Sequence, residues 1–303
     1  MNDPMNQHTL RMTYSFEGKG LHSGRRVHVR LCPAPADTGV VFVRTDMDGA
    51  RVPALASNVC STRRSTMLKA GRAKVGTVEH VLSALTGLGV DNALVELDGA
   101  EMPILDGSAR RYVEAIAPDG LIDQGVARKW VTVRQEILIR GPRHGAWIKI
   151  TPAAEPSIDL TIDFGSKVVG EQRASFSSGD SYAAAVAPCR TFCFLHEIMP
   201  QLMMGLIKGG DLNNAIVVVE KPVSKFKAWY LASILGKTVP DVSQAGYLAE
   251  GGLRFPDECA RHKLLDLIGD LRLCGGMPCF RVEAYKPGHA LNTAAAREIL
   301  KHL

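Results

Sequence analysis

Three acid–base side chains recur at every fourth position in one segment of this 303-residue chain. They are His262, Asp266 and Asp270. The leucines and isoleucine around them follow helical spacing, so the sequence predicts a helix over residues 257–271. Positions four apart on a helix lie about 40° from one another, and the three side chains therefore share one face. An isolated His-x-x-x-Asp pair more commonly supports a solvated helix, so this motif alone decides little.

A second His–carboxylate pair stands at the predicted start of another helix. Glu79 and His80 open a run of helical spacing that ends at Gly87. A metal hydrolase needs a ligand and, beside it, a carboxylate base that does not fill the coordination site. By itself this pair has a more ordinary explanation, because a first-turn Glu is favoured by the helix dipole and a half-buried His is common.

A third histidine, His289, follows a Pro-Gly pair and is expected on a loop over a cleft. The candidate metal ligands are then His80, His262 and Asp266. The groups left for proton transfer and orientation are Glu79, His289 and Asp270. Three protein ligands with one open position are typical of catalytic zinc, which polarises a carbonyl and lowers the pKa of a bound water toward about 7. The residues therefore predict zinc-dependent hydrolysis.

Two other functions remain open for the same residues. Two histidines and one carboxylate also form the facial triad of iron oxygenases, which need a cosubstrate and more open coordination positions. Glu79 has no obvious task in an oxygenase, although Fe²⁺ could also occupy the site of a hydrolase. A protein that binds a nucleotide sugar or a lipid without catalysis is the third possibility.

Six motifs, spread in order from residue 20 to residue 292, together resemble the zinc deacetylase family that acts on UDP-3-O-acyl-N-acetylglucosamine in lipid A biosynthesis. The motifs are Gly20–Gly24, Thr77–His80, Met102–Ala109, Arg190–Phe192, Arg261–Asp270 and Gly288–Asn292. The resemblance covers nearly the whole chain. It implies hydrolysis of the N-acetyl group of UDP-3-O-(3-hydroxyacyl)-N-acetylglucosamine, with release of acetate and the free amine.

The resemblance also implies a role for each group at the centre. It assigns zinc to the three ligands already inferred from spacing, and it makes Glu79 the general base. His289 would be the protonated partner that stabilises the oxyanion and helps the amine to leave, and Asp270 would hold it in place. Thr191 would donate a hydrogen bond to the tetrahedral intermediate.

Seven further residues are expected to contact the substrate. They are Lys263 and Lys286 for the diphosphate, His22 for the nucleotide, Phe164 for uracil, Glu197 for the sugar hydroxyls, and Phe192 and Phe194 for the acyl chain. An ammonium group suits a diphosphate. An acyl chain needs an apolar passage, and the stretch near 191–218 is rich in Phe, Leu, Ile and Met.

Strand and helix patterns alternate in both halves of the chain and would position these residues. Strands are expected over 27–31, 40–43, 93–97, 131–139, 146–150 and 158–164, and helices over 77–87 and 109–116. Residues 91–96 resemble residues 213–218, which suggests an internal duplication. We therefore expect two α+β lobes, residues 1–125 and 126–303, each a sheet layered against helices, with a Lys-containing insert over 220–252. The resemblance places the active site between the lobes.

Composition excludes several classes of protein. The chain has 46% hydrophobic and 22% charged residues, and it contains no apolar run of the roughly 18 residues that a membrane span requires. Its first twenty residues lack the pattern of a secretory signal, so a cytoplasmic location is expected. The seven cysteines include no Cys-x-x-Cys pair, which argues against a disulfide framework.

The net charge of +5 comes from scattered basic residues rather than from a dense stripe, so we expect no nucleic-acid partner. The expected partner is an acylated UDP-sugar. We expect a monomer that makes, at most, transient contact with the surface of the inner membrane.

Overall fold

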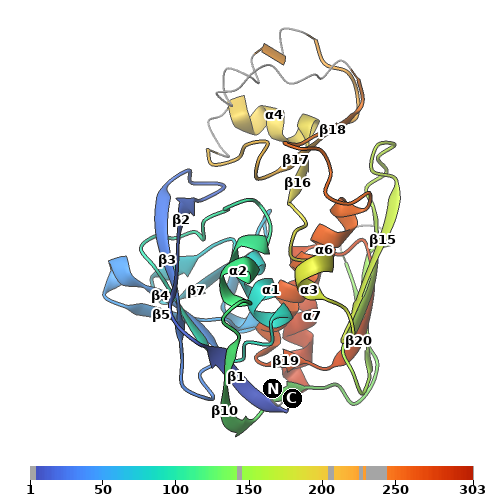
Figure 1. The fold of residues 1–303 in the computed structure, drawn as a ribbon. Coiled ribbons are helices and arrows are strands. Elements are labelled where there is room, and N and C mark those ends of the chain that lie inside the picture. Colours follow the sequence, from blue (N-terminus) through green and yellow to red (C-terminus); the bar gives the residue numbers. More distant parts are fainter. Residues whose placement is uncertain (1–4, 142–144, 204–207, 225–227, 230–243, 303) are drawn as a thin grey trace.

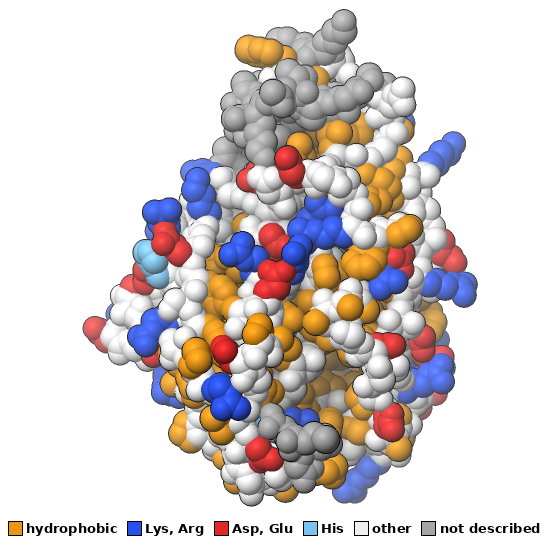
Figure 2. Space-filling model, in the orientation of Figure 1, with side chains coloured by type: hydrophobic (Ala, Val, Ile, Leu, Met, Phe, Trp, Pro, Cys, Tyr) orange, Lys and Arg blue, Asp and Glu red, His pale blue; other side chains and the backbone are white. Residues whose placement is uncertain are grey.

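The computed structural model describes residues 5–141, 145–203, 208–224, 228–229 and 244–302. Two sheets stand on either side of a central group of helices, and a smaller unit projects from one end (Figure 1). Acidic and basic side chains are interspersed over the face shown in Figure 2. Among the described residues, no helix is both long and apolar enough to span a membrane.

The first half of the chain is built on a five-stranded sheet. In spatial order its strands are β2 (Tyr14–Lys19), β3 (Arg26–Pro33), β9 (Ala93–Leu97), β4 (Val40–Arg44) and β5 (Ala50–Pro53). Neighbouring strands are antiparallel except β4 and β9, which are parallel. Alternate residues of β3 and β9 are buried, as expected for strands with one face on a core. The helices before and after β9 are α1 (Glu79–Gly87) and α2 (Arg110–Ile116).

The second half repeats this topology. Its five-stranded sheet has the order β12 (Ile137–Arg140), β13 (Trp147–Pro152), β20 (Phe280–Tyr285), β14 (Ser157–Asp163) and β15 (Glu171–Ser177). Again one pair, β14 and β20, is parallel, and the other neighbours are antiparallel. The helices before and after β20 are α6 (Glu258–Leu271) and α7 (His289–Lys301). The predicted fold of two α+β lobes, each a sheet with its helices, is confirmed.

The repeat is present, but the predicted alignment of residues 91–96 with 213–218 is wrong. Residues 93–97 form β9, and the strand in the equivalent place is β20. Residues 216–219 form β17 (Ile216–Val219), the middle strand of a small sheet with β16 (Phe192–Phe194) and β18 (Gly246–Leu248). The two segments look alike because a buried middle strand needs a short apolar run after a turn in either setting.

The single strand predicted over 131–139 is also wrong, because the chain changes partners there. Trp130–Val131 forms β11, which pairs in parallel with β19 (Met277–Pro278). The chain then leaves that pairing, and β12 begins at Ile137 in the five-stranded sheet. The segment predicted as one strand therefore contributes to two separate sheets.

The remaining elements connect or flank the two large sheets. They are β1 (Asn6–Leu10), β6 (Val59–Ser61), β7 (Met67–Ala70), β8 (Ala73–Val75), β10 (Leu121–Ala127), α3 (Tyr182–Ala185), α4 (Leu195–Met203), and the 3₁₀ turns η1 (Thr45–Met47), η2 (Ala56–Asn58) and η3 (Arg272–Cys274). β10 pairs with β1 and continues two residues past the predicted boundary at 125/126, and the division into two domains stays a prediction. Of the predicted insert over 220–252, residues 225–227 and 230–243 lie outside the described residues.

Helix α1 of the first half packs against α6 of the second half. The contact requires a glycine at position 269, because a Cβ added there would lie 2.1 Å from the carbonyl oxygen of Glu79. In the close-packed interior neither helix has free space to move into. Gly269 thus fixes the approach of the segment that carries Glu79 and His80 to the segment that carries His262 and Asp266.

Replacing Gly269 with Ala should therefore destabilise the fold. We expect a loss of about 1–3 kcal/mol in the free energy of unfolding, the usual effect of overpacking, measured by urea denaturation. Gly179→Ala is the matched control, since a Cβ at Gly179 would meet nothing within 4 Å. Equal stability of the two variants would contradict the tight helix contact.

Candidate metal centre and active-site cavity

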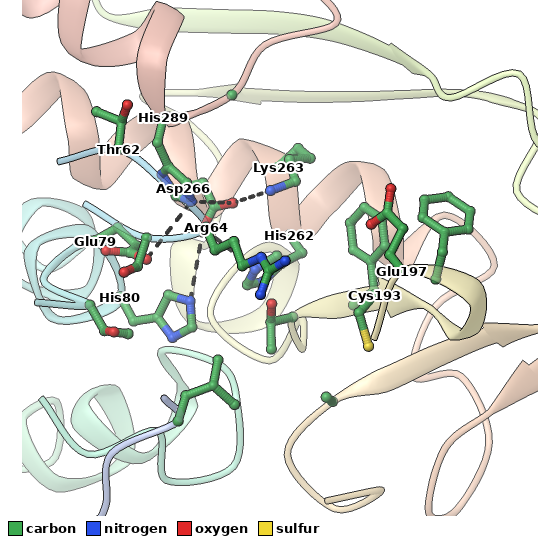
Figure 3. Close-up of a pocket in the computed structure, with 18 of the residues that line it drawn as sticks. Thr62, Arg64, Glu79, His80, Cys193, Glu197, His262, Lys263, Asp266 and His289 are labelled. Carbon is green, nitrogen blue, oxygen red and sulfur yellow. Dashed lines mark hydrogen bonds and ion pairs between the residues drawn. The ribbon is translucent and has the colours of Figure 1, made fainter. Parts of the chain in front are cut away.

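A cavity of about 400 Å³ is lined by residues from both halves of the chain. The first half contributes residues that include His22, Glu79 and His80, and the second half contributes residues that include Thr191 and Asp266. Figure 3 shows the labelled side chains of α1 and α6 pointing toward one another in this cavity. Residues as far apart in the sequence as His22 and Asp266 therefore share one site.

Three buried side chains could hold a metal ion at this site. The ligand atoms of His80, His262 and Asp266 all lie within 4.8 Å of one another. Asp266 Oδ1 lies 3.4 Å from His262 Nε2 and 3.8 Å from His80 Nε2. Two ligands about 2.1 Å from one ion in tetrahedral geometry lie about 3.4 Å apart, so the observed spacing is close to that of a metal site.

The hydrogen bonding and charge of these groups fit a divalent cation. Asp266 Oδ1 is buried and has no hydrogen-bond partner among the described residues, which is costly for a carboxylate oxygen without a cation. Burial lowers the pKa of His80 to about 4 and that of His262 to about 3, so both imidazoles are neutral at pH 7. Burial opposes ionisation of Asp266. His262, which is protonated only at the low pH where Asp266 itself titrates, and the ammonium group of Lys263 outweigh the effect of burial, so the net pKa of Asp266 is lowered. Two neutral imidazoles and one carboxylate are a donor set suited to zinc.

Neighbouring groups orient two of the three candidate ligands. His262 Nδ1 lies 3.0 Å from the carbonyl oxygen of Cys189, and a proton donated there leaves Nε2 free for a metal. Lys263 Nζ donates to Asp266 Oδ2 at 2.6 Å, so that only Oδ1 remains without a partner. The two contacts leave His262 Nε2 and Asp266 Oδ1, which lie 3.4 Å apart, as the atoms available to a metal ion.

A second cluster lies beside the first and contains Glu79, His289 and Asp270. His289 Nε2 is 3.8 Å from Glu79 Oε1, and His289 Nδ1 is 2.9 Å from Asp270 Oδ2. Burial alone would lower the pKa of His289, but the charges of Asp270, Asp266 and Glu79 raise it to about 9. Burial raises the pKa of Glu79 to about 8, with Asp270 and Asp266 contributing and His289 opposing. The site therefore holds a protonated imidazole next to a carboxyl that titrates near neutral pH.

His289 does not lie on a loop as predicted, because it is the first residue of α7. Gly288 before it is extended, and the helix begins at once, which anchors the imidazole at its first turn. This placement lets Asn292, one turn later, share the same carboxylate, since its Nδ2 donates to Asp270 Oδ2 at 2.9 Å.

No sequence pattern points to Thr66, although it contacts both acidic groups of this cluster. Its backbone N–H donates to Glu79 Oε2 at 3.0 Å, and its hydroxyl donates to Asp270 Oδ1 at 2.5 Å. Thr66 is fully buried in the turn before β7. Because 204 positions separate it from Asp270, only the folded chain reveals the contact.

The structure places all seven predicted substrate contacts on the cavity wall. They are His22, Phe164, Phe192, Phe194, Glu197, Lys263 and Lys286. The three phenylalanines pack edge to face, with the ring centroid of Phe164 lying 5.5 Å from those of Phe192 and Phe194. Lys286 Nζ forms an ion pair with Asp163 at 3.0 Å. Thr191 also lines the cavity, whereas Asp270 lies behind His289.

Three of the six non-glycine residues with positive φ in the described part of the chain line this cavity. Arg64, Thr77 and Lys286 have φ values of 70°, 57° and 54°, and all three line the wall. Left-handed backbone is uncommon for residues other than glycine and tends to occur at functional sites. No sequence pattern identifies Arg64 or Thr62 as a site residue. Both line the cavity, and Arg64 also has the left-handed backbone.

Known proteins resemble this chain over nearly its whole length. The family model for UDP-3-O-acyl N-acetylglycosamine deacetylase matches residues 7–228 and 238–301. A UDP-3-O-acyl-N-acetylglucosamine deacetylase of Trichormus variabilis is 41% identical, over 98% of this chain and 99% of its own. One of Myxococcus xanthus is 41% identical, over 97% of this chain and 86% of its own. The "Bifunctional enzyme LpxC/FabZ" of Porphyromonas gingivalis is 40% identical over 98% of this chain, which spans 64% of that relative's length.

Replacing Asp266 with Asn should weaken binding of a divalent ion by more than about 100-fold, because it removes a ligand rather than a group that orients one. Competition with a chromophoric chelator measures the zinc dissociation constant directly. Asp163→Asn is the control, since Asp163 also pairs with a lysine but is not one of the three clustered ligands. Similar zinc affinity in both variants would remove Asp266 from the ligand set.

Proposed function

We propose, because this chain belongs to the UDP-3-O-acyl N-acetylglycosamine deacetylase family, that it hydrolyses the N-acetyl group of UDP-3-O-(3-hydroxyacyl)-N-acetylglucosamine in lipid A biosynthesis. The family membership confirms the resemblance carried by the six sequence motifs. One observation carries the proposal for this chain itself: His80, His262 and Asp266 converge beside Glu79 in a cavity. We propose zinc as the resident ion and acetate and the free amine as products.

A zinc ion bound at these three residues would polarise the amide carbonyl and acidify a water molecule. We propose that Glu79 accepts the proton of the attacking water, because its side chain lines the same cavity as the three candidate ligands and precedes one of them, His80, in the sequence. A cation next to Glu79 favours the ionised carboxylate and so opposes the upward pKa shift that burial causes. This gives Glu79 the role of general base.

We propose that His289 acts as the acid. Its pKa of about 9 keeps it protonated at pH 7, and Asp270 accepts its Nδ1 proton, which leaves Nε2–H to face the cavity. From there it stabilises a developing oxyanion and donates a proton to the departing amine. Thr191, at the cavity wall, supplies a hydroxyl that can donate to the tetrahedral intermediate.

The remainder of the cavity suits an acylated nucleotide sugar. Phe192, Phe194 and Ile198 form an apolar wall next to the candidate metal ligands, and this is the place for the acyl chain. Lys263 and Lys286 supply ammonium groups for the diphosphate, and Glu197 can accept hydrogen bonds from sugar hydroxyls. His22 and Phe164 remain our candidates for contacts with the nucleotide. Family membership favours this hydrolysis over the iron-oxygenase alternative.

We also propose that the protein works in the cytoplasm as a monomer. The substrate carries a fatty acyl chain, which makes transient contact with the surface of the inner membrane the natural way to obtain it. Fe²⁺ in place of Zn²⁺ is compatible with the same three ligands.

Replacing Glu79 with Gln should reduce kcat by about 10²- to 10⁴-fold, because it removes the general base but keeps the shape of the side chain. Acetate release from the acylated UDP-sugar measures the rate, and metal analysis should show that zinc is retained. Glu298→Gln, at a half-buried site on α7 that does not line the cavity, is the control for handling and folding. A rate equal to that of the wild type would exclude Glu79 as the base.

Acetate release should depend strongly on the acyl chain. We expect UDP-N-acetylglucosamine without an acyl chain to be hydrolysed with a kcat/KM at least about 100-fold lower, because burial of the chain provides binding energy used in the transition state. Parallel assays on the two substrates test this. Binding of the acylated substrate without release of any acetate would favour a non-catalytic binding protein.

A further inference from the structure

A buried ion pair joins Arg190 to Glu258 next to the proposed metal centre. Arg190 is 1% exposed and Glu258 is not exposed at all. The guanidinium donates from Nε to Glu258 Oε1 at 3.0 Å and from Nη2 to Oε2 at 3.1 Å, a two-point contact. The backbone N–H of Arg190 donates to the same Oε1 at 3.0 Å. Charged groups persist in such a dry place only when they are paired and well hydrogen-bonded.

The same pair holds three segments of chain together. Arg190 Nη1 donates to the carbonyl oxygen of Glu250 at 2.9 Å, and Nη2 donates to that of Gly252 at 2.5 Å. These carbonyls follow β18, where the chain returns from the small sheet that includes Phe192 and Phe194. The backbone N–H of Arg254 donates to Glu258 Oε2 at 2.6 Å. The small sheet is thus tied to the first turn of α6.

The residues on either side of Arg190 reach the site directly. Cys189, just before it, supplies the carbonyl oxygen that accepts from His262 Nδ1. Thr191, just after it, lines the cavity, and its backbone N–H donates to the carbonyl of Gly107 at 2.8 Å. Glu258 stands one helical turn before His262 on α6. A change in the pair would therefore move the carbonyl that orients one candidate metal ligand.

We propose that Arg190 and Glu258 are a positioning pair. They hold the Cys189 carbonyl against His262 and hold Thr191 at the cavity wall, so that affinity for the metal depends on this pair. The inference deepens the proposed function and rests on it for the identity of the site, but its test reads metal binding without reference to turnover.

Some buried ion pairs only stabilise a fold, and the chain offers a matched example. Arg128 and Asp91 pair at 2.8 Å, with side chains that are 7% and 9% exposed. Arg128 also donates to the carbonyl of Gly89, and Asp91 accepts from the backbone of His8. Neither His8 nor Gly89 lines the cavity. Removing a charge from this pair should affect stability alone.

The experiment compares Glu258→Gln with Asp91→Asn in the full chain. Each protein is stripped of metal and titrated with zinc alone in competition with a chromophoric chelator, and its urea midpoint is measured in parallel. We expect both variants to lower the midpoint. Glu258→Gln should also raise the zinc dissociation constant about 10- to 100-fold, the usual effect of losing a group that supports a ligand, whereas Asp91→Asn should change it less than about 2-fold.

Arg190→Lys provides a second variant that keeps both charges. A single ammonium can pair with Glu258, but it cannot also reach both carbonyls as the guanidinium fork does. We expect a rise of at least about 3-fold in the zinc dissociation constant, and this variant decides the matter if Glu258→Gln does not fold. Zinc affinity within 2-fold of the wild type in every variant that folds, despite lower midpoints, would overturn the inference.

Failure of the proposed function would give a different result. A wild-type protein that binds zinc tightly but releases no acetate would overturn the deacetylase proposal and leave the positioning pair intact. A wild-type protein that binds no zinc would overturn both.

Discussion

The site depends on how closely α1 approaches α6. At the crossing, Gly269 presents no side chain to the carbonyl oxygen of Glu79, and the two backbones come into direct contact. The first turn of α1 thereby lies opposite the middle of α6, so one candidate ligand from the first half of the chain meets two from the second. A metal–ligand bond is only about 2 Å long, so helix packing must be accurate to a fraction of that length. The same contact therefore provides both core packing and site geometry.

Buried charge is the second constraint, and the surroundings of each carboxylate determine its behaviour. Asp266 is flanked by Lys263 and two imidazoles, and its pKa is lowered despite burial. Glu79 is equally buried but lies near Asp270 and Asp266, and its pKa is raised to about 8. Carboxyl groups whose surroundings push their pKa values apart are typical of sites that divide binding and proton transfer between them. In this chain the division matches the roles that we propose.

Sequence reasoning succeeded where the information is local. The face shared by His262, Asp266 and Asp270 follows from helical spacing, and α1 and α6 lie where that spacing predicted. It failed where a contact depends on the fold. The hydroxyl of Thr66 meets Asp270 across 204 positions, and the Cys189 carbonyl that orients His262 is a backbone atom, which every residue type has. The internal repeat was detected but assigned to β17 instead of β20, because both are buried middle strands.

The strand order has a consequence for synthesis of the chain on the ribosome. In the second large sheet, the central strand β20 is the last to be made, and it comes more than a hundred residues after its neighbours β13 and β14. A nascent chain that has reached only residue 279 therefore has no strand to join these two, and both present unpaired backbone groups. Such edges can pair wrongly with other chains. The central strand of the first sheet, β9, ends at residue 97, so all five strands of that sheet can pair long before β20 has been synthesised.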